Sequence, residues 1–270
     1  RIDKTNGQEG RNMKYYVVDA FADRLFSGNP AGVCVLDGPM DSALMQSIAF
    51  ENNLAETAFF YPDGDVYRLK WFTPVAEIDL CGHATLASAY VVMRFVEPDA
   101  REVRFETLSG RLTVTREGEV LTLNFPSRRP VPCAVPEGLE KALGVKILEA
   151  HSSRDMLCLV ESEAVLKSIR PDYQALAAIH GPLGFVVTAK GDTYDFVSRF
   201  FAPNTGIDED PVTGSTHTNL IPFWSERLGK TKMTAAQLSS RGGVLYCENC
   251  GERVKIGGTA VCYLQGELLL

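Results

Sequence analysis

The chain of 270 residues lacks the features of several large functional classes. It has no excess of basic charge, because 27 Lys and Arg residues stand against 34 Asp and Glu residues and give a net charge of -7. An acidic protein is poorly suited to nucleic acid or to an anionic membrane. The chain also lacks an apolar run of about 18 residues, the length that a membrane-spanning helix requires. We therefore expect neither nucleic acid nor a membrane as a partner.

The signatures of common cofactors are missing as well. There is no phosphate-binding loop and no dinucleotide fingerprint. The seven cysteines have no framework spacing, which is typical of reduced thiols in the cytoplasm. Cys247-x-x-Cys250 resembles half a zinc site, but no second pair accompanies it, and a hairpin turn at 248–251 explains it better. We predict a cytoplasmic protein that uses no cofactor and no metal.

What the chain does contain is a long internal repeat. The two copies share a Phe-x-Pro, then an Ile-Asp, then a Gly within small polar residues: Phe72-Thr73-Pro74, Ile78-Asp79 and Cys81-Gly82-His83-Ala84-Thr85 in one, and Phe201-Ala202-Pro203, Ile207-Asp208 and Thr213-Gly214-Ser215-Thr216-His217 in the other. The offset is close to half the chain. Two like lobes create an interface, and such interfaces are where ligand sites form.

The pattern around the repeat predicts mostly short strands. They are rich in β-branched and aromatic residues and are separated by Gly, Pro, Asn and Asp: 15–21, 32–36, 57–61, 66–72, 103–107, 112–115, 121–125, 155–161, 184–189, 194–200, 243–247 and 252–264. Helices are predicted at 41–52 and 172–180. The segment 83–96 is apolar on nearly every side, so we expect a helix enclosed by a rolled sheet.

These elements predict an α+β fold of two pseudo-symmetric lobes. Each lobe is expected to be a barrel-like, mostly antiparallel sheet wrapped round a central helix, with lobes at 13–126 and 127–270 and a polar tail at 1–12. The second central helix is predicted to begin at Gly214 or Ser215. Pro222 lies inside it and costs about 3 kcal/mol there, so we expect a kink or an interruption.

Both Gly-containing motifs lie immediately before a central helix. Free N–H groups and the helix dipole make such a start an anion site. Cys81-Gly82-His83 and Thr213-Gly214-Ser215 should therefore face each other and hold a small carboxylate between them. The alternative is ordinary N-capping by Thr213 and Ser215.

Three titratable residues lie in or near these motifs. His83 can donate, accept or orient, although many histidines are structural. Asp210 is one of three successive carboxylates, 208–210, whose crowding should raise the pKa of one of them; the alternative is a solvated turn. Glu56 opens an apolar strand and should be partly desolvated, as a general acid/base requires, unless it is an exposed strand end.

Cys81 is the remaining reactive candidate. A thiol beside a helix start can be acidified, but a small buried residue is the alternative. Its counterpart in the second copy is Thr213, so a mechanism with one thiol on each lobe lacks its second thiol.

Several motifs together resemble the PhzF-like phenazine biosynthesis family, which shares its fold with diaminopimelate epimerase and proline racemase. They run from Met13 to 256–261 and cover the native chain: Val18-Asp19-Ala20-Phe21, Ser27-Gly28-Asn29-Pro30-Ala31-Gly32, Asn53-Leu54-Ala55-Glu56-Thr57-Ala58-Phe59, the 72–85 copy and 208–215. The resemblance implies a homodimer with a site between two lobes. It also implies a cofactor-independent isomerase that moves a proton within a small amino-acid-like carboxylate.

The resemblance also implies roles for individual residues. Glu56 matches the proton-shuttling carboxylate, and His83 and Asp210 match supporting catalytic residues. The substrate-binding positions are matched by Gly82, His83, Gly214 and Ser215. A well-understood member isomerises trans-2,3-dihydro-3-hydroxyanthranilate. Two rival hypotheses stay open: a thiol-assisted epimerase or lyase that uses Cys81, and an inactive protein that only binds a small molecule.

Overall fold

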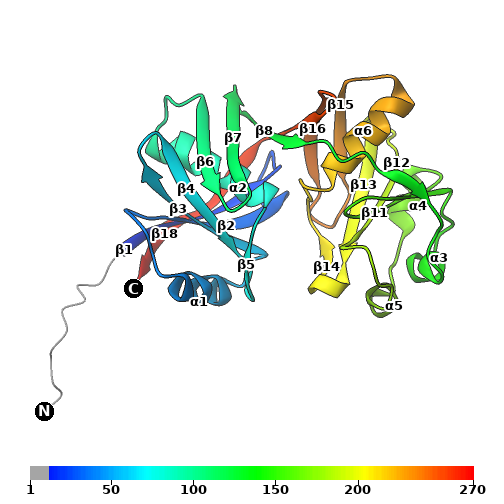
Figure 1. Cartoon of the computed structure of the whole chain (residues 1–270), viewed down its shortest axis with the longest axis horizontal. Coiled ribbons are helices and arrows are strands. Elements are labelled where there is room, and N and C mark those ends of the chain that lie inside the picture. The colour runs from blue at the N-terminus through cyan, green and yellow to red at the C-terminus, as the bar shows by residue number, and fades with distance from the viewer. Residues whose placement is uncertain (1–11) are drawn as a thin grey trace, which may run out of the picture.

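The computed structural model describes residues 12–270, and Figure 1 shows two lobes side by side. The predicted tail at 1–12 lies, except for its last residue, outside the described residues. Within residues 12–270, no helix is long and apolar enough to cross a membrane.

The first lobe is built mainly from the N-terminal half of the chain. Its elements are β1 Asn12–Ala20, β2 Asn29–Val35, α1 Ser42–Asn52, β3 Glu56–Asp63, β4 Val66–Phe72, β5 Glu77–Ile78, α2 Gly82–Val91, the π-helix η1 Val92–Val96, β6 Glu102–Thr107, β7 Gly110–Glu117, β8 Val120–Pro126 and the returning strand β18 Ala260–Leu269.

The second lobe follows the same plan. Its elements are β9 Val131–Cys133, α3 Leu139–Leu143, β10 Glu149–Ser152, β11 Met156–Leu159, α4 Glu163–Ser168, α5 Tyr173–Ala177, β12 Phe185–Lys190, β13 Phe196–Ala202, the 3-10 helix η2 Pro203–Thr205, β14 Ile207–Asp210, α6 His217–Leu228, β15 Lys232–Gln237, β16 Gly243–Asn249 and β17 Arg253–Gly258.

Strand pairing repeats the sequence duplication. In the first lobe β2 runs parallel to β3, β3 antiparallel to β4, β4 parallel to β6, and β6, β7 and β8 follow antiparallel. The second lobe has the same order and directions in β11, β12, β13, β15, β16 and β17. Most pairs are antiparallel, so the predicted α+β fold is confirmed.

Two strand pairs connect the halves of the chain. β8 and β17, the last repeated strand of each lobe, pair antiparallel and make the sheet continuous between the lobes. β18 pairs with β1 along its length, so the final strand lies with the first lobe. The predicted lobe boundary between residues 126 and 127 stays a prediction. β18 belongs with the first lobe although it follows that boundary in the sequence.

The two central helices are enclosed, as the apolar run at 83–96 predicts. In α2 every residue except Tyr90 is buried, and α6 is buried from His217 to Ser225. α6 continues through Pro222, so the helix is not interrupted there, and the kink, the other expectation, stays a prediction. Pro222 cannot bond the Thr218 carbonyl, but the Arg128 N–H takes that oxygen at 3.0 Å. The lost helical hydrogen bond is thus replaced from outside the helix.

Two local features concern a cap and a turn. Asp41 caps α1 by accepting from the N–H groups of Ala43 and Leu44 at 3.0 and 3.2 Å. Met45, Ile48 and Ala49 form the buried side of this helix, whereas Leu44 is 41% exposed. Cys247 lies in β16 and Cys250 in the hairpin turn between β16 and β17, where Gly251 has a φ of +80°; the turn at 250–252 comes slightly later than predicted.

Candidate active site

The backbones of the two repeat motifs touch where the lobes meet. A Cβ placed on Gly82 would lie 3.6 Å from Gly214 Cα and 3.7 Å from Ser215 N. α2 starts at Gly82, whereas Gly214–Thr216 forms a turn and α6 starts at His217. The structure therefore brings together Gly82, Gly214 and Ser215, although their loops are distant in sequence.

Glu56 and His83 form a buried pair beside this contact. Glu56 is the first residue of β3 and His83 the second residue of α2. Glu56 Oε2 lies 3.0 Å from His83 Nε2, and the side chains are 11% and 6% exposed. Glu56 is thus a buried side chain rather than an exposed strand end.

The environment of His83 favours its positive charge. Burial by itself lowers the pKa of His83, but its polar neighbours outweigh burial and raise that pKa well above its usual value. Because the pKa of the Cys81 thiol is itself raised, the Glu56 carboxylate is the charged partner that favours the imidazolium. A charged imidazole at the start of α2 adds to the positive potential of the free N–H groups there. This side of the site is suited to negative charge.

Asp210 approaches the same place from the other lobe. It ends β14 and is buried, and its Oδ1 accepts from Asn29 Nδ2 at 2.8 Å. Asn29 Nδ2 also donates to the Val212 carbonyl at 2.9 Å and lies 3.3 Å from His83 Nδ1. One amide therefore connects the acidic side chain of the second lobe with the imidazole of the first.

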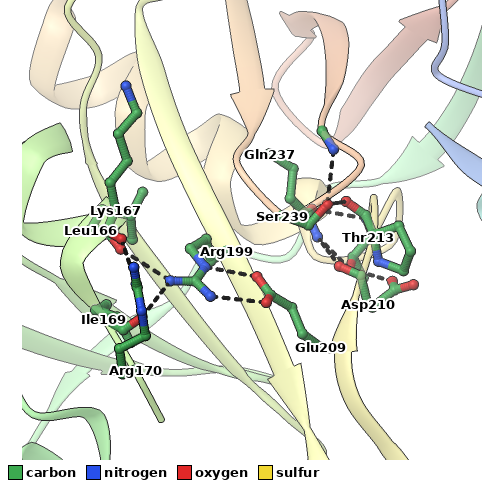
Figure 2. A network of polar contacts seen from close by, with 12 residues as sticks. Leu166, Lys167, Ile169, Arg170, Arg199, Glu209, Asp210, Thr213, Gln237 and Ser239 are labelled. Atoms are coloured by element: carbon green, nitrogen blue, oxygen red, sulfur yellow. Dashed lines mark hydrogen bonds and ion pairs between the residues drawn. The ribbon is translucent and has the colours of Figure 1, made fainter. Parts of the chain in front are cut away.

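The predicted crowding of Asp208, Glu209 and Asp210 is not what shifts the pKa of Asp210. Burial raises this pKa above its usual value, and Glu56 adds to the rise, while His83, the Thr213 hydroxyl and Asn29 oppose it. Its neighbours in sequence take no part, because Asp208 is exposed and Glu209 binds Arg199 on the opposite face of the strand at 2.7 and 2.9 Å. Figure 2 shows the Glu209 carboxylate directed at Arg199, away from Asp210. Strand alternation separates Glu209 from Asp210, so these two carboxylates do not crowd each other.

Ser215 has a cationic neighbour that the sequence did not reveal. Its Oγ accepts from Arg154 Nη2 at 2.8 Å, and Arg154 also binds the buried Asp155 at 3.1 and 3.3 Å. Because arginine can only donate, the Ser215 hydroxyl hydrogen is directed elsewhere. It is available to an acceptor at the turn before α6.

Cys81 is buried at the N-cap position of α2 and makes no capping hydrogen bond. Its Sγ lies 3.6 Å from His83 Nδ1. Burial raises the pKa of the Cys81 thiol, and the nearby Glu56 raises it further, although His83 opposes both. The neutral thiol is favoured, which weakens the case for a thiolate base.

The sequence suggested no cluster of metal ligands, but the fold assembles one group of suitable side chains. Glu56, Cys81 and His83 offer ligand atoms that all lie within 4.8 Å of one another. The sulfur faces Nδ1 of the imidazole and the carboxylate faces Nε2. An ion bound to one ring nitrogen would not reach all three residues without a turn of the ring. The arrangement fits an acid/base pair better than a preformed metal site.

Sequence reasoning missed three polar residues around this site: Asn29, Arg154 and Gln237. Asn29 lies in the Ser27-Gly28-Asn29-Pro30 motif, which carries the family resemblance but does not indicate a role for the Asn29 amide. The other two lie in no recognisable motif. Their contacts join segments far apart in the chain, so no local pattern could have found them.

Comparison with known proteins agrees with this architecture. A profile of the family described as "Phenazine biosynthesis-like protein" matches residues 18–266. The chain belongs to this family. A Pseudomonas aeruginosa protein named as an uncharacterised isomerase is 50% identical over 96% of this chain and 99% of its own. Relatives of this chain that are 46 to 50% identical to it are named isomerases, and the chain is accordingly an isomerase.

Solved structures show how far the likeness extends. The crystal structure of a PhzF family protein from Enterococcus faecalis superposes with a TM-score of 0.95 at 48% identity, covering 96% of this chain and 100% of that one. A hydroxyproline epimerase from Agrobacterium vitis superposes with a TM-score of 0.61 at 12% identity, over 96% and 93%. The second match shows a shared fold alone.

Proposed function

We propose that this family member is a cofactor-independent isomerase that moves a proton within a small amino-acid-like carboxylate. The observation that carries the proposal is the buried Glu56 carboxylate, 3.0 Å from His83 Nε2 and next to the start of α2, where Gly82 meets the turn that precedes α6. A carboxylate in such a place is shielded from bulk water and can keep a proton between two transfer steps.

In the proposed step, Glu56 takes a proton from one carbon of the substrate. The electron pair of the broken C–H bond enters the π system, and Glu56 returns the same proton to another carbon. No electron leaves the substrate, so an oxidant or reductant is not needed. His83 and Asp210 hold the charges that arise as the π system rearranges.

The proposed grip on the substrate uses the second half of the site. N–H groups near Gly82 and Gly214 and the hydroxyl of Ser215 donate to the substrate carboxylate. Because the backbones at Gly82 and Gly214 already touch, substrate entry requires the lobes to move apart, and their closure then excludes water. A homodimer in the cytoplasm is part of the same expectation, and sedimentation of the purified protein tests the dimer.

The experiment is proton NMR of the purified protein with trans-2,3-dihydro-3-hydroxyanthranilate in deuterated water. We expect a rearranged product, with the Glu56→Gln variant inactive. A lack of reaction with this compound and with a panel of small unsaturated amino acids would count against an active isomerase. It would favour the rival hypothesis of a protein that only binds a small molecule.

A further inference from the structure

Asp210 takes the place of an apolar residue of the first copy. Strand β14 pairs Asp210 with Phe200, as β5 pairs Ile78 with the equivalent Trp71. Three additional residues of the second copy come before this position, because Ile78 follows Phe72 by six positions and Asp210 follows Phe201 by nine. A buried carboxylate where the first copy has an isoleucine needs polar support of its own.

Gln237, at the end of β15, supplies that support. It is fully buried, and its Nε2 donates to the Asp210 carbonyl at 2.7 Å and to Thr213 Oγ1 at 3.1 Å. Its Oε1 accepts from the Thr213 N–H at 2.9 Å. A backbone N–H can only donate and a carbonyl can only accept, so the amide has one possible orientation. Figure 2 shows Gln237 next to Asp210 and Thr213.

This orientation determines how the Thr213 hydroxyl is used. Oγ1 receives a hydrogen from Gln237, and Thr213 donates its own hydrogen to Asp210 Oδ2. A donor aimed at a carboxylate stabilises the charged form. We propose that Gln237 is a positioning residue that directs the Thr213 hydroxyl at Asp210 and so favours the ionised form of this side chain, which can stabilise positive charge or accept a proton.

Other groups around Asp210 do not explain this control. From the first lobe, Asn29 donates to Oδ1, His83 attracts the charged carboxylate and Glu56 repels it. These effects depend on the lobes being together. Gln237 and Thr213 belong to the same lobe as Asp210, so their effect persists when the lobes open. The inference rests on the proposed role of Asp210 in proton transfer, but its test needs no substrate.

The test is a titration of the Asp210 carboxyl by carbon NMR in unliganded protein labelled at the aspartate side chains, with Asp210→Asn for assignment. Gln237→Met removes the donor at similar volume. We expect the midpoint of Asp210 to rise by about one pH unit. Ser239→Ala is the matched control, because Ser239 holds the same segment by donating to the Pro211 carbonyl at 2.8 Å, and in the described part of the chain no hydrogen bond joins it to Thr213. The titration midpoint of Asp210 should not move in this control variant.

A second pair of variants separates the hydroxyl from the fold. Thr213→Val keeps the shape and should raise the midpoint as Gln237→Met does, while Thr213→Ser should leave it unchanged. The two effects should not add in the double variant. An unchanged midpoint in Thr213→Val, or in a folded Gln237→Met, would overturn the proposal, as would an equal shift in Ser239→Ala. If Gln237→Met does not fold, the Asp210 titrations in Thr213→Val and Thr213→Ser test the proposal. Failure here leaves turnover by Glu56 intact, whereas failure of the proposed function leaves the titration intact.

Discussion

The two copies of the repeat place different chemistry on the same scaffold. The first copy supplies His83 and, through β3, the partner Glu56, so it contains the acid/base pair. In the second copy Ser215 takes the position of His83 and accepts a hydrogen bond from Arg154. Duplication explains why the two helix starts converge. Under the proposed function, the substitutions after duplication leave the Glu56–His83 pair in the first half, and the second half supplies Ser215 as a donor to the substrate carboxylate together with Asp210.

A smaller contrast shows the same history. Thr85 and His217 are equivalent, and each donates to the carbonyl four residues earlier, that of Cys81 and that of Thr213 (2.9 Å from His217 Nδ1). The local geometry is therefore retained while the side chain has changed. Only the second copy carries an ionisable ring in this role.

The largest effect is expected from the first half of the site. Glu56→Gln keeps the shape but cannot accept a proton, so kcat should fall by at least about a thousandfold while ligand binding changes little. Steady-state kinetics and calorimetry measure the two quantities. Glu163→Gln is the control, since Glu163 is also buried but binds Lys167 and the Asp192 N–H in the second lobe. Equal losses in both variants would contradict the assignment.

The next largest effect is expected on the free energy of unfolding, and it arises at His217 in the second lobe. Burial lowers the pKa of His217 to about 4, below its usual 6.5. Between these values the unfolded chain binds the proton that the folded protein refuses, so stability should fall as the pH falls. The loss amounts to about 3 kcal/mol from pH 6.5 to 4. Urea unfolding across this range measures it, and His217→Thr, the residue of the first copy, should flatten the slope. An unchanged slope would refute the prediction.

A smaller effect is expected at Ser215. Ser215→Ala removes a hydroxyl donor to the substrate carboxylate and should raise KM by about tenfold with kcat nearly preserved. Ser225→Ala, at the far end of α6, removes a hydroxyl that bonds only the Lys230 carbonyl at 2.6 Å and should leave KM unchanged. A fall in kcat with constant KM would move Ser215 from binding to chemistry.

The smallest effect is expected at Cys81. Because its thiol is buried and neutral, Cys81→Ala should reduce kcat less than about threefold, as should Cys158→Ala, which removes a buried thiol in the second lobe. Loss of activity in the Cys81 variant alone would favour the thiol-assisted epimerase or lyase.

Much of the fold could be predicted because its signals are local. The β-rich pattern identified β4 at 66–72 with its observed ends, and the apolar run after Gly82 identified an enclosed helix. Short elements such as β9 and β14 were missed, because two to four residues carry too little periodicity. The interruption expected at Pro222 does not occur, because the Arg128 N–H, from another segment of the chain, donates to the carbonyl that Pro222 leaves free.

The candidate site was predictable where motifs carried it and not elsewhere. Glu56, His83 and Asp210 were found by position, but Asn29 and Gln237 act through contacts with residues distant in the chain. The crowding expected among residues 208–210 failed because strand alternation turns Glu209 towards Arg199. The direction of the Glu209 side chain in the short strand β14 determines whether it lies near Asp210, and composition does not reveal that direction.

The most direct test of this division of labour measures substrate binding and turnover side by side in Glu56→Gln and Ser215→Ala. The account predicts that the Glu56 variant binds substrate with near-normal affinity and does not turn it over, whereas the Ser215 variant binds weakly and turns over at nearly the normal maximal rate. Loss of the same parameter in both variants would contradict it.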